Sequence, residues 1–257
     1  MEFVWKKRKN DQLAAIDNLI KEVKISPLVA SLLVRRGITT FDQAECFFRP
    51  KISQINDPFV FHQMNEAVDT LSQALEKKYK IRLYGDYDVD GTTAVAVMWN
   101  VLHFYYKNLE CYIPDRYAEG YGISTQGIDT AKENKCTLII ALDCGIKAID
   151  KVAYAFKKEV DFIICDHHRP GAEIPKAKAV LDPKQEDCDY PFKELCGCGV
   201  GFKLIQALAS KKGATIDDLV LYLDLVATAI GADIVPIVGE NRILAYHGLK
   251  VINENPR

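Results

Sequence analysis

The sequence predicts an α/β fold: a doubly wound, mainly parallel sheet with helices on both faces, preceded by a helical N-terminal segment. From residue 80 onward, short apolar runs alternate with stretches of helical periodicity, as in consecutive βαβ units. The run 137–142 is apolar throughout, which is typical of a parallel strand buried on both faces. Before residue 80 the periodicity is helical only. We therefore expect a helical N-terminal cap region over 1–79 and the main α/β domain over 80–257.

The composition is that of a soluble globular protein, with 257 residues, 49% hydrophobic and 26% charged. No apolar run approaches the ~18 residues of a membrane span, and the first residues lack the apolar core of a signal peptide. A cytoplasmic protein is the expectation. The net charge of −2 gives no global positive field, so a polyanionic partner would have to be held by local basic patches or by metal ions.

The eight cysteines contain no C-x-x-C pair, which argues against a zinc ribbon. Cys144 and Cys165 lie in or beside apolar runs, where a reduced thiol behaves as a small hydrophobic side chain. We expect all eight cysteines to be reduced and structural.

The N-terminal region contains signals for four helices. Apolar residues recur at helical spacing over 11–23, and Ser26-Pro27 is a typical start for a helix through Leu33. Thr40 is a candidate N-cap for a third helix that ends near Phe48. An extended link then leads to a fourth helix over about 65–78.

The α/β domain contains five candidate strands separated by helices. The predicted strands are 81–84, 110–113, 137–142, 161–165 and 179–181. The predicted helices are 92–106, 124–134, 146–158, 199–211, 216–230 and 241–253. This alternation favours parallel pairing, and ligands of such sheets lie beyond the carboxyl ends of the strands.

An acidic loop follows the strand 81–84. Asp86, Asp88 and Asp90 place three carboxylates within five residues, where they repel one another and lose solvation together. A fold tolerates such a cluster mainly when cations neutralise it. The alternative is a solvated acidic turn in which Asp90 caps the next helix.

Two later strands also end in potential metal ligands. Strand 137–142 runs directly into Asp143, and strand 161–165 runs into Asp166-His167-His168. Carboxylate oxygens with imidazole nitrogen suit Mn²⁺ or Mg²⁺ and fit poorly with metals that prefer thiolates. Two such ions about 3.5–4 Å apart would clamp the attacking water and the leaving oxygen of a phosphoester. The sequence therefore predicts a metal centre at this edge of the sheet.

Several individual roles stay open from the residues alone. Asp86 and Asp88 would point to the same side if the chain stays extended, and Asp143 could bridge two ions. Asp90 fits a capping or supporting role as well as direct ligation. One of the two adjacent histidines is expected to be a ligand and the other to lie near the phosphate, with Asp166 orienting an imidazole.

With these motifs in this order, the chain resembles the DHH phosphoesterase superfamily and, within it, the RecJ family of exonucleases that degrade single-stranded DNA from the 5′ end. The motifs are Gly85–Gly91, Asp143–Gly145, Asp166–His168 and Asp233. Further similar segments are 35–38, 47–50, 113–122, 194–201 and 235–242. The resemblance extends from about residue 20 to the end of the sequence.

The resemblance implies a ligand set for two Mn²⁺ or Mg²⁺ ions, consisting of Asp86, Asp88, Asp143, His167 and Asp233. It implies that His168 lies at the scissile phosphate and that water activated by the ions attacks phosphorus. We group Asp90 and Asp166 with His168 as catalytic residues in supporting roles.

Candidate substrate contacts lie in two further segments. Arg116 is the basic side chain chosen for a phosphate contact, with a salt bridge to Glu119 as the equal alternative. Gly199 and Gly201 could present backbone amides to a phosphate. A tight packing turn explains the two glycines equally well.

The expected function is metal-dependent 5′ to 3′ hydrolysis of single-stranded DNA in repair and recombination, with single-strand-binding protein and a helicase as possible partners. A phosphodiesterase or pyrophosphatase acting on a small substrate is the alternative within the superfamily. A non-catalytic nucleic-acid-binding scaffold is the alternative from another class. The resemblance also leads us to expect a second substrate-binding domain and an oligonucleotide-binding barrel, which have no counterpart in these 257 residues.

Overall fold

The computed structural model describes residues 3–4 and 12–257, which divide into two compact units between Lys51 and Ile52. The expected division between residues 79 and 80 therefore lies inside the second unit. Residues 64–76 form a helix whose apolar face belongs to the core of that unit.

The first unit contains three of the four helices predicted for the N-terminal region: α1 (Leu13–Val23), α2 (Pro27–Val34) and α3 (Phe41–Phe48). The hydroxyl of Ser26 accepts a hydrogen bond from the amide of Val29 at the start of α2. Thr40 and Gln43 form a capping box at the start of α3, which satisfies amides that the helix leaves unpaired. The three helices share a small apolar core, made of Ile16, Leu19, Ala30, Leu33, Val34 and Ala44.

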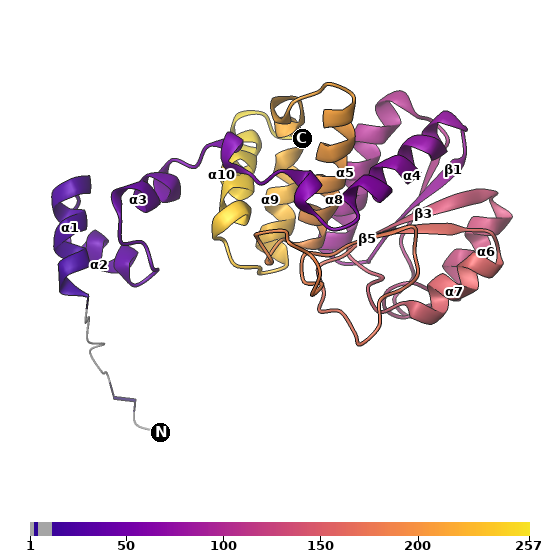
Figure 1. Cartoon of the computed structure of the whole chain (residues 1–257), viewed down its shortest axis with the longest axis horizontal. Helices are drawn as coiled ribbons and strands as arrows, with labels where there is room; N and C mark the ends of the chain where they lie inside the picture. Colours follow the sequence, from indigo (N-terminus) through magenta and orange to yellow (C-terminus); the bar gives the residue numbers. More distant parts are fainter. Residues whose placement is uncertain (1–2, 5–11) are drawn as a thin grey trace. The chain divides into compact units, whose positions relative to one another are not determined.

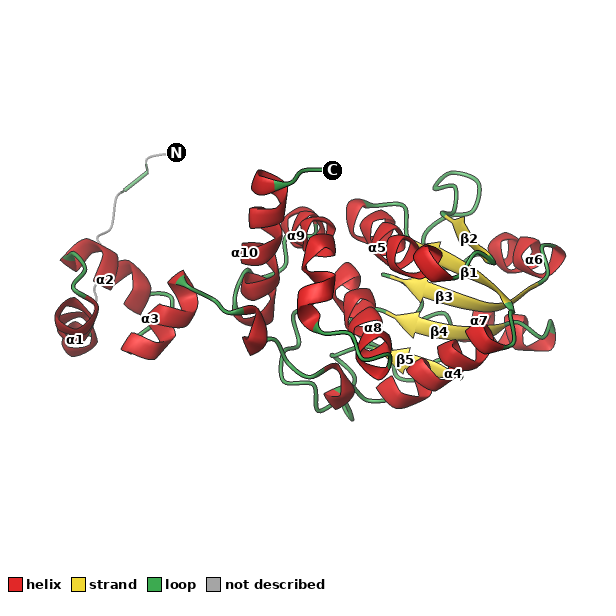
Figure 2. Ribbon diagram, turned by 90° about the horizontal axis from the view of Figure 1, so that it is seen from above, coloured by secondary structure: helices red, strands yellow, loops and turns green. Residues whose placement is uncertain are grey.

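The second unit is built on a five-stranded sheet in which every neighbouring pair is parallel. The strand order is β2-β1-β3-β4-β5, as Figure 2 shows. The strands are β1 (Lys80–Gly85), β2 (Leu109–Tyr112), β3 (Cys136–Leu142), β4 (Asp161–Cys165) and β5 (Ala179–Leu181). The predicted fold class is confirmed.

Helices cover both faces of this sheet (Figure 1). On one face, α4 (Met64–Glu76), α5 (Val89–Tyr105), α8 (Gly197–Lys211) and α9 (Leu223–Ala232) contribute to the larger core. On the other face, α6 (Thr125–Glu133) and α7 (Ile149–Lys157) pack on a smaller core. Alternate residues of the central strands enter the two cores, because successive side chains of a strand point to opposite faces.

Some boundaries differ from the prediction. Helix α5 begins at Val89, three residues before the predicted start, because the side chain of Asp88 caps it. The predicted helix 216–230 is divided into the 3-10 helix η3 (Ile216–Tyr222) and α9. The segment expected to be extended before α4 contains the 3-10 turns η1 (Ile52–Gln54) and η2 (Pro58–Val60).

A buried ion pair joins α8 to α10 (Gly239–Glu254), the last helix. The ammonium of Lys203 lies 2.9 Å from Glu240 Oε1, and both side chains are almost completely buried. The hydroxyl of Tyr190 donates to the other oxygen of Glu240, and Asn56 donates to both oxygens. Four segments far apart in sequence therefore meet at one carboxylate. No helix in the described part of the chain has the length and apolarity of a membrane span.

Candidate metal centre

The register of the sheet aligns the residues that follow four of its strands. Gly85 pairs with Leu142, Leu142 with Cys165, and Cys165 with Leu181. In each of these strands the next residue is an aspartate. This row of four strand-end aspartates consists of Asp86, Asp143, Asp166 and Asp182, all of them buried. Sequence reasoning identified the first three and missed Asp182, although the same signal of an apolar strand followed by aspartate is present there.

The described residues place potential metal ligands in three overlapping groups, in each of which the ligand atoms lie within 4.8 Å of one another. The groups are Asp86–Asp88–Asp143, Asp90–His167–Asp233 and Asp143–His167–His168. Asp143 and His167 each belong to two groups. The structure therefore brings together all five residues of the predicted ligand set, and adds Asp90 and His168 to them.

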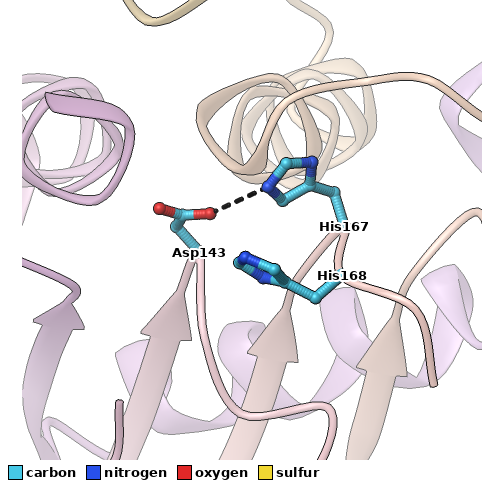
Figure 3. Close-up of side chains that lie close together, drawn as sticks. All are labelled: Asp143, His167 and His168. Carbon is cyan, nitrogen blue, oxygen red and sulfur yellow. Dashed lines mark ion pairs between the residues drawn. The ribbon is translucent and has the colours of Figure 1, made fainter. Parts of the chain in front are cut away.

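His167 lies at the centre of the cluster and is only 6% exposed. Its Nε2 is 3.2 Å from Asp143 Oδ1, a contact drawn in Figure 3. The same nitrogen is 3.7 Å from Asp233 Oδ2 and 3.8 Å from Asp90 Oδ2. Burial lowers the pKa of His167 to about 4, so the ring is neutral near pH 7. A neutral imidazole facing several carboxylates is a suitable metal ligand.

Some buried carboxylate oxygens of the cluster have no hydrogen-bond partner among the described residues. Oδ2 of Asp86 and Oδ1 of Asp143 are buried and accept no hydrogen bond from any described residue. Burial raises the pKa of Asp143 to about 11, and the nearby charges of Asp90 and Asp88 add to this effect. Buried polar atoms without partners are uncommon in folded proteins. A divalent cation would supply the missing partner, and the residues present therefore fit Mn²⁺ or Mg²⁺.

The backbone of Asp143 contributes to the geometry. The residue adopts a left-handed conformation with φ of 62°, immediately after β3. Aspartate tolerates this region better than most side chains do. Its amide still donates to the carbonyl of Cys165, so the ladder between β3 and β4 continues through the turn.

Asp88 and Asp90 have different hydrogen-bond partners from those expected. Asp88, which is exposed, caps α5 by accepting from the amide of Gly91 at 3.0 Å. The buried carboxylate of Asp90 accepts from the amides of Gly197 and Cys198, at 2.6 and 2.8 Å. The idea that Asp90 caps the helix following it is therefore wrong, because it bonds to the N-terminus of α8 instead. Burial raises the pKa of Asp90 to about 6, although the two amides oppose this shift.

Asp166 orients the catalytic candidate His168. Its Oδ1 lies 2.7 Å from His168 Nδ1, and its Oδ2 accepts from the amide of Ile146. Burial alone would raise the pKa of Asp166, but the bonds from His168 and from backbone amides lower it below the ordinary value. The same contact with Asp166 raises the pKa of His168.

Tyr121 is a site residue that sequence reasoning did not single out. Its hydroxyl is 3.2 Å from Nε2 of His168, and its ring meets that of Tyr87 edge to face. The sequence signal for Tyr121 is its place within the segment 113–122, which belongs to the resemblance. Tyr121 lines an open cleft of about 250 Å³ beside His168, together with Lys147 and Lys151.

The predicted substrate contacts have mixed outcomes. The guanidinium of Arg116 lies 5.1 Å from the ring centroid of Tyr87. Among the described residues no ion pair joins Arg116 to Glu119, whose carboxylate instead accepts from the hydroxyl of Tyr112.

The two candidate glycines are buried in the first turns of α8. The amide of Gly199 donates to Cys196 Sγ. A Cβ on Gly201 would lie 3.0 Å from Leu142. These surroundings favour the packing interpretation of both glycines over a phosphate contact.

Comparison with known proteins gives a match over residues 80–230 to the model of the DHH family, N-terminal domain. The single-stranded-DNA-specific exonuclease RecJ of Bacillus subtilis (strain 168) is 43% identical over 253 residues, which is 98% of this chain and 31% of the relative. The protein of the same name from Escherichia coli (strain K12) is 31% identical over 242 residues, 89% of this chain and 41% of the relative. The chain thus spans less than half the length of these two curated relatives.

Solved structures of RecJ proteins are also similar to this chain. A crystal structure of RecJ from Thermus thermophilus in complex with Mn²⁺ superposes with a TM-score of 0.77 at 27% identity, covering 93% of this chain and 33% of that one. A crystal structure of exonuclease RecJ bound to manganese gives a TM-score of 0.68 at 32% identity, covering 74% of this chain and 48% of that one.

Proposed function

The chain belongs to the DHH family, and from that premise we propose that it hydrolyses phosphodiester bonds in single-stranded DNA from the 5′ end, using two Mn²⁺ or Mg²⁺ ions. One observation carries the proposal. Two groups of potential ligands, Asp86–Asp88–Asp143 and Asp90–His167–Asp233, lie side by side and meet where Asp143 contacts His167. This arrangement suits two neighbouring ions.

Asp86, Asp88 and Asp143 would hold one ion in this proposal. His167 and Asp233 would hold the other, with Asp143 between the two. Bound Mn²⁺ or Mg²⁺ would lower the pKa of a water molecule and neutralise charge on the phosphate. Asp90, whose two oxygens already accept hydrogen bonds from α8, supports the second group from the side.

His168 would act on the phosphate through its Nε2. Because Nδ1 faces the Asp166 carboxylate, Nδ1 is assigned the proton of the neutral ring, and Nε2 is directed toward Tyr121 and the cleft. The raised pKa of His168 increases the fraction of imidazolium near pH 7. An imidazolium there would stabilise negative charge that develops on the phosphate oxygens.

The cleft beside His168 would receive the DNA end. Lys147 and Lys151 line it and offer positive charge to the backbone, while Tyr121 offers an aromatic face to a base. Arg116 and Tyr87, whose ring contacts that of Tyr121, would add a further positive charge and a further aromatic ring to this surface. A cytoplasmic role in DNA repair and recombination, with single-strand-binding protein and a helicase as partners, is the cellular setting that family membership suggests.

The test is degradation of a single-stranded oligonucleotide labelled at either end, with Mn²⁺ present. We expect mononucleotides to be released from the 5′ end and chelation by EDTA to stop the reaction. His168→Ala should remove most of the activity. A matched control is His62→Ala, because His62 lies at the surface beside Asp187 and in none of the ligand groups.

Hydrolysis of cyclic dinucleotides or pyrophosphate without any DNA degradation would contradict the proposal and favour a small-substrate phosphodiesterase. Failure of the protein to bind Mn²⁺ in a calorimetric titration would instead favour a non-catalytic scaffold.

A further inference from the structure

We propose that Gly197, the first residue of α8, is a positioning residue of the metal centre. Its lack of a side chain allows the helix to approach so closely that it holds Asp90 and limits where the Asp143 carboxylate can lie. This inference rests on the proposed function, since it concerns the same two-ion site. It names a residue outside the ligand set whose substitution should change metal binding.

The start of α8 holds the carboxylate of Asp90. The Asp90 side chain is 1% exposed, and it belongs to α5, yet both of its oxygens accept hydrogen bonds from the first amides of α8. Helix N-termini favour negative charge, and here the amides of Gly197 and Cys198 fix the orientation of a carboxylate. Oδ2 of Asp90 thereby stays 3.8 Å from His167 Nε2.

Gly197 also lies directly against the side chain of Asp143. A Cβ built on Gly197 would lie 2.3 Å from Asp143 Oδ1 and 2.6 Å from Asp143 Cβ. A Cβ atom essentially never comes this close to a non-bonded atom, and Asp143 Cβ is not the mobile end of a side chain. A methyl group on residue 197 would therefore force Asp143 or the start of α8 to move. Either movement would change the position of a carboxylate that belongs to two of the three ligand groups.

Gly199 provides a matched control in the same helical turn. It is also buried, and a Cβ there would have its nearest neighbours in Leu195 and Cys196, at 3.4 to 3.6 Å. These are ordinary van der Waals distances. Replacing glycine by alanine within a helix favours the helix in both cases. A difference between the two variants would therefore report the contact of residue 197 with Asp143.

The first experiment is calorimetric titration of Mn²⁺ into the full chain, as wild type, Gly197→Ala and Gly199→Ala. We expect Gly197→Ala to weaken Mn²⁺ binding by about 10-fold or more, the size of effect seen when groups supporting metal ligands are changed. Gly199→Ala should leave the dissociation constant almost unchanged. Equal affinities for wild type and Gly197→Ala would overturn the inference.

The second experiment needs no metal and uses thermal unfolding. Gly197→Ala should lower the melting temperature of the wild type and should not lower it in an Asp143→Gly background, where the opposing side chain is gone. Glycine also accepts the positive φ at position 143. If Gly197→Ala destabilises the wild type and the Asp143→Gly protein equally, the added methyl group clashes with a residue other than Asp143. The inference is then wrong, even when Gly197→Ala binds Mn²⁺ poorly.

The two failures can be told apart. If the wild type itself binds no Mn²⁺, the proposed function fails. In that case the unfolding comparison still decides whether Gly197 positions Asp143. If the wild type binds Mn²⁺ and Gly197→Ala binds it equally well, only the positioning role is lost.

Discussion

At the scale of single residues, Asp143 combines a left-handed backbone with a buried oxygen that accepts no hydrogen bond from the described residues. We expect Asp143→Asn to stabilise the metal-free protein, because the raised pKa of Asp143 means that folding takes up a proton near pH 7, whereas asparagine is neutral without one. Asparagine suits the positive φ as well as aspartate does. The gain should be on the order of 1–3 kcal/mol in the free energy of unfolding, measured by urea denaturation in EDTA.

The same variant should lose metal-dependent nuclease activity almost completely. Asp161→Asn is the matched control, since Asp161 lies at the opposite end of β4 from the ligands and is 41% exposed beside Lys178. Near-wild-type activity of Asp143→Asn would refute the bridging role of this carboxylate.

Metal binding should depend on pH because the free site retains protons. The raised pKa values of Asp90, about 6, and of Asp143, about 11, mean that the folded protein holds protons that the unfolded chain has released. The stability of the metal-free protein should therefore fall as the pH rises above about 4, the ordinary carboxyl range. The ions must displace these protons, so affinity for Mn²⁺ should rise with pH.

Calorimetry at about pH 6 and pH 8, in buffers of different ionisation enthalpy, measures this linkage directly. We expect the affinity to increase by up to about tenfold per pH unit for each proton released. A dissociation constant that does not change with pH, together with no proton release, would contradict these pKa shifts.

Much of the site could be predicted because its candidate ligands directly follow strands that are recognisable in the sequence. Asp86, Asp143 and Asp166 each follow an apolar run, and parallel strands bring such ends to one edge. The hydrogen-bond partners of Asp90 could not be predicted. They are two backbone amides, which carry no side-chain signal and lie 107 and 108 residues away in sequence. Asp182 follows a three-residue strand that was itself predicted, so the signal that identified the other three aspartates also applied to it.

At the scale of elements, the ion pair of Lys203 and Glu240 fixes α8 against α10. We expect Glu240→Gln to destabilise the protein by about 3–5 kcal/mol, since it leaves a buried ammonium without its counter-charge. Chemical denaturation monitored by tryptophan fluorescence and by circular dichroism measures this loss.

Another ion pair of α8 provides the control. Lys211 lies 2.6 Å from Asp69 of α4, but these side chains are 39% and 60% exposed. Asp69→Asn should change stability by no more than about 1 kcal/mol. If Glu240→Gln and Asp69→Asn lower the free energy of unfolding equally, burial does not make the Lys203–Glu240 pair more important for stability than the exposed pair.

The local sequence pattern predicts which helices and strands form better than it predicts the residues at which they begin and end. Strands β4 and β5 have the predicted bounds, because a polar residue marks each start, Asp161 in β4 and Lys178 before β5, and an aspartate follows each apolar run. The start of α5 differs because the capping side chain is Asp88, one of three similar candidates in the acidic loop. Periodicity alone does not distinguish η3 from α9, since the apolar pattern continues across both.

At the scale of the whole molecule, all candidate ligands lie within Ile52–Arg257, and the helices of the first unit have an apolar core of their own. We expect residues 52–257 produced alone to unfold cooperatively and to bind Mn²⁺ within about twofold of the full chain. Gel filtration, thermal unfolding and calorimetry check this outcome. Loss of cooperative unfolding would show that the second unit needs the first.

The dispersal of the ligands along the sequence has a consequence for the order of events in folding. The metal centre takes one side chain from the end of β1, others from the ends of β3 and β4, and Asp233 from the end of α9. The full set of ligands is therefore assembled only after β1, β3 and β4 have paired and α9 has packed into the larger core. We therefore expect bound ions to have little effect on the early steps of folding and to slow the unfolding of the folded protein.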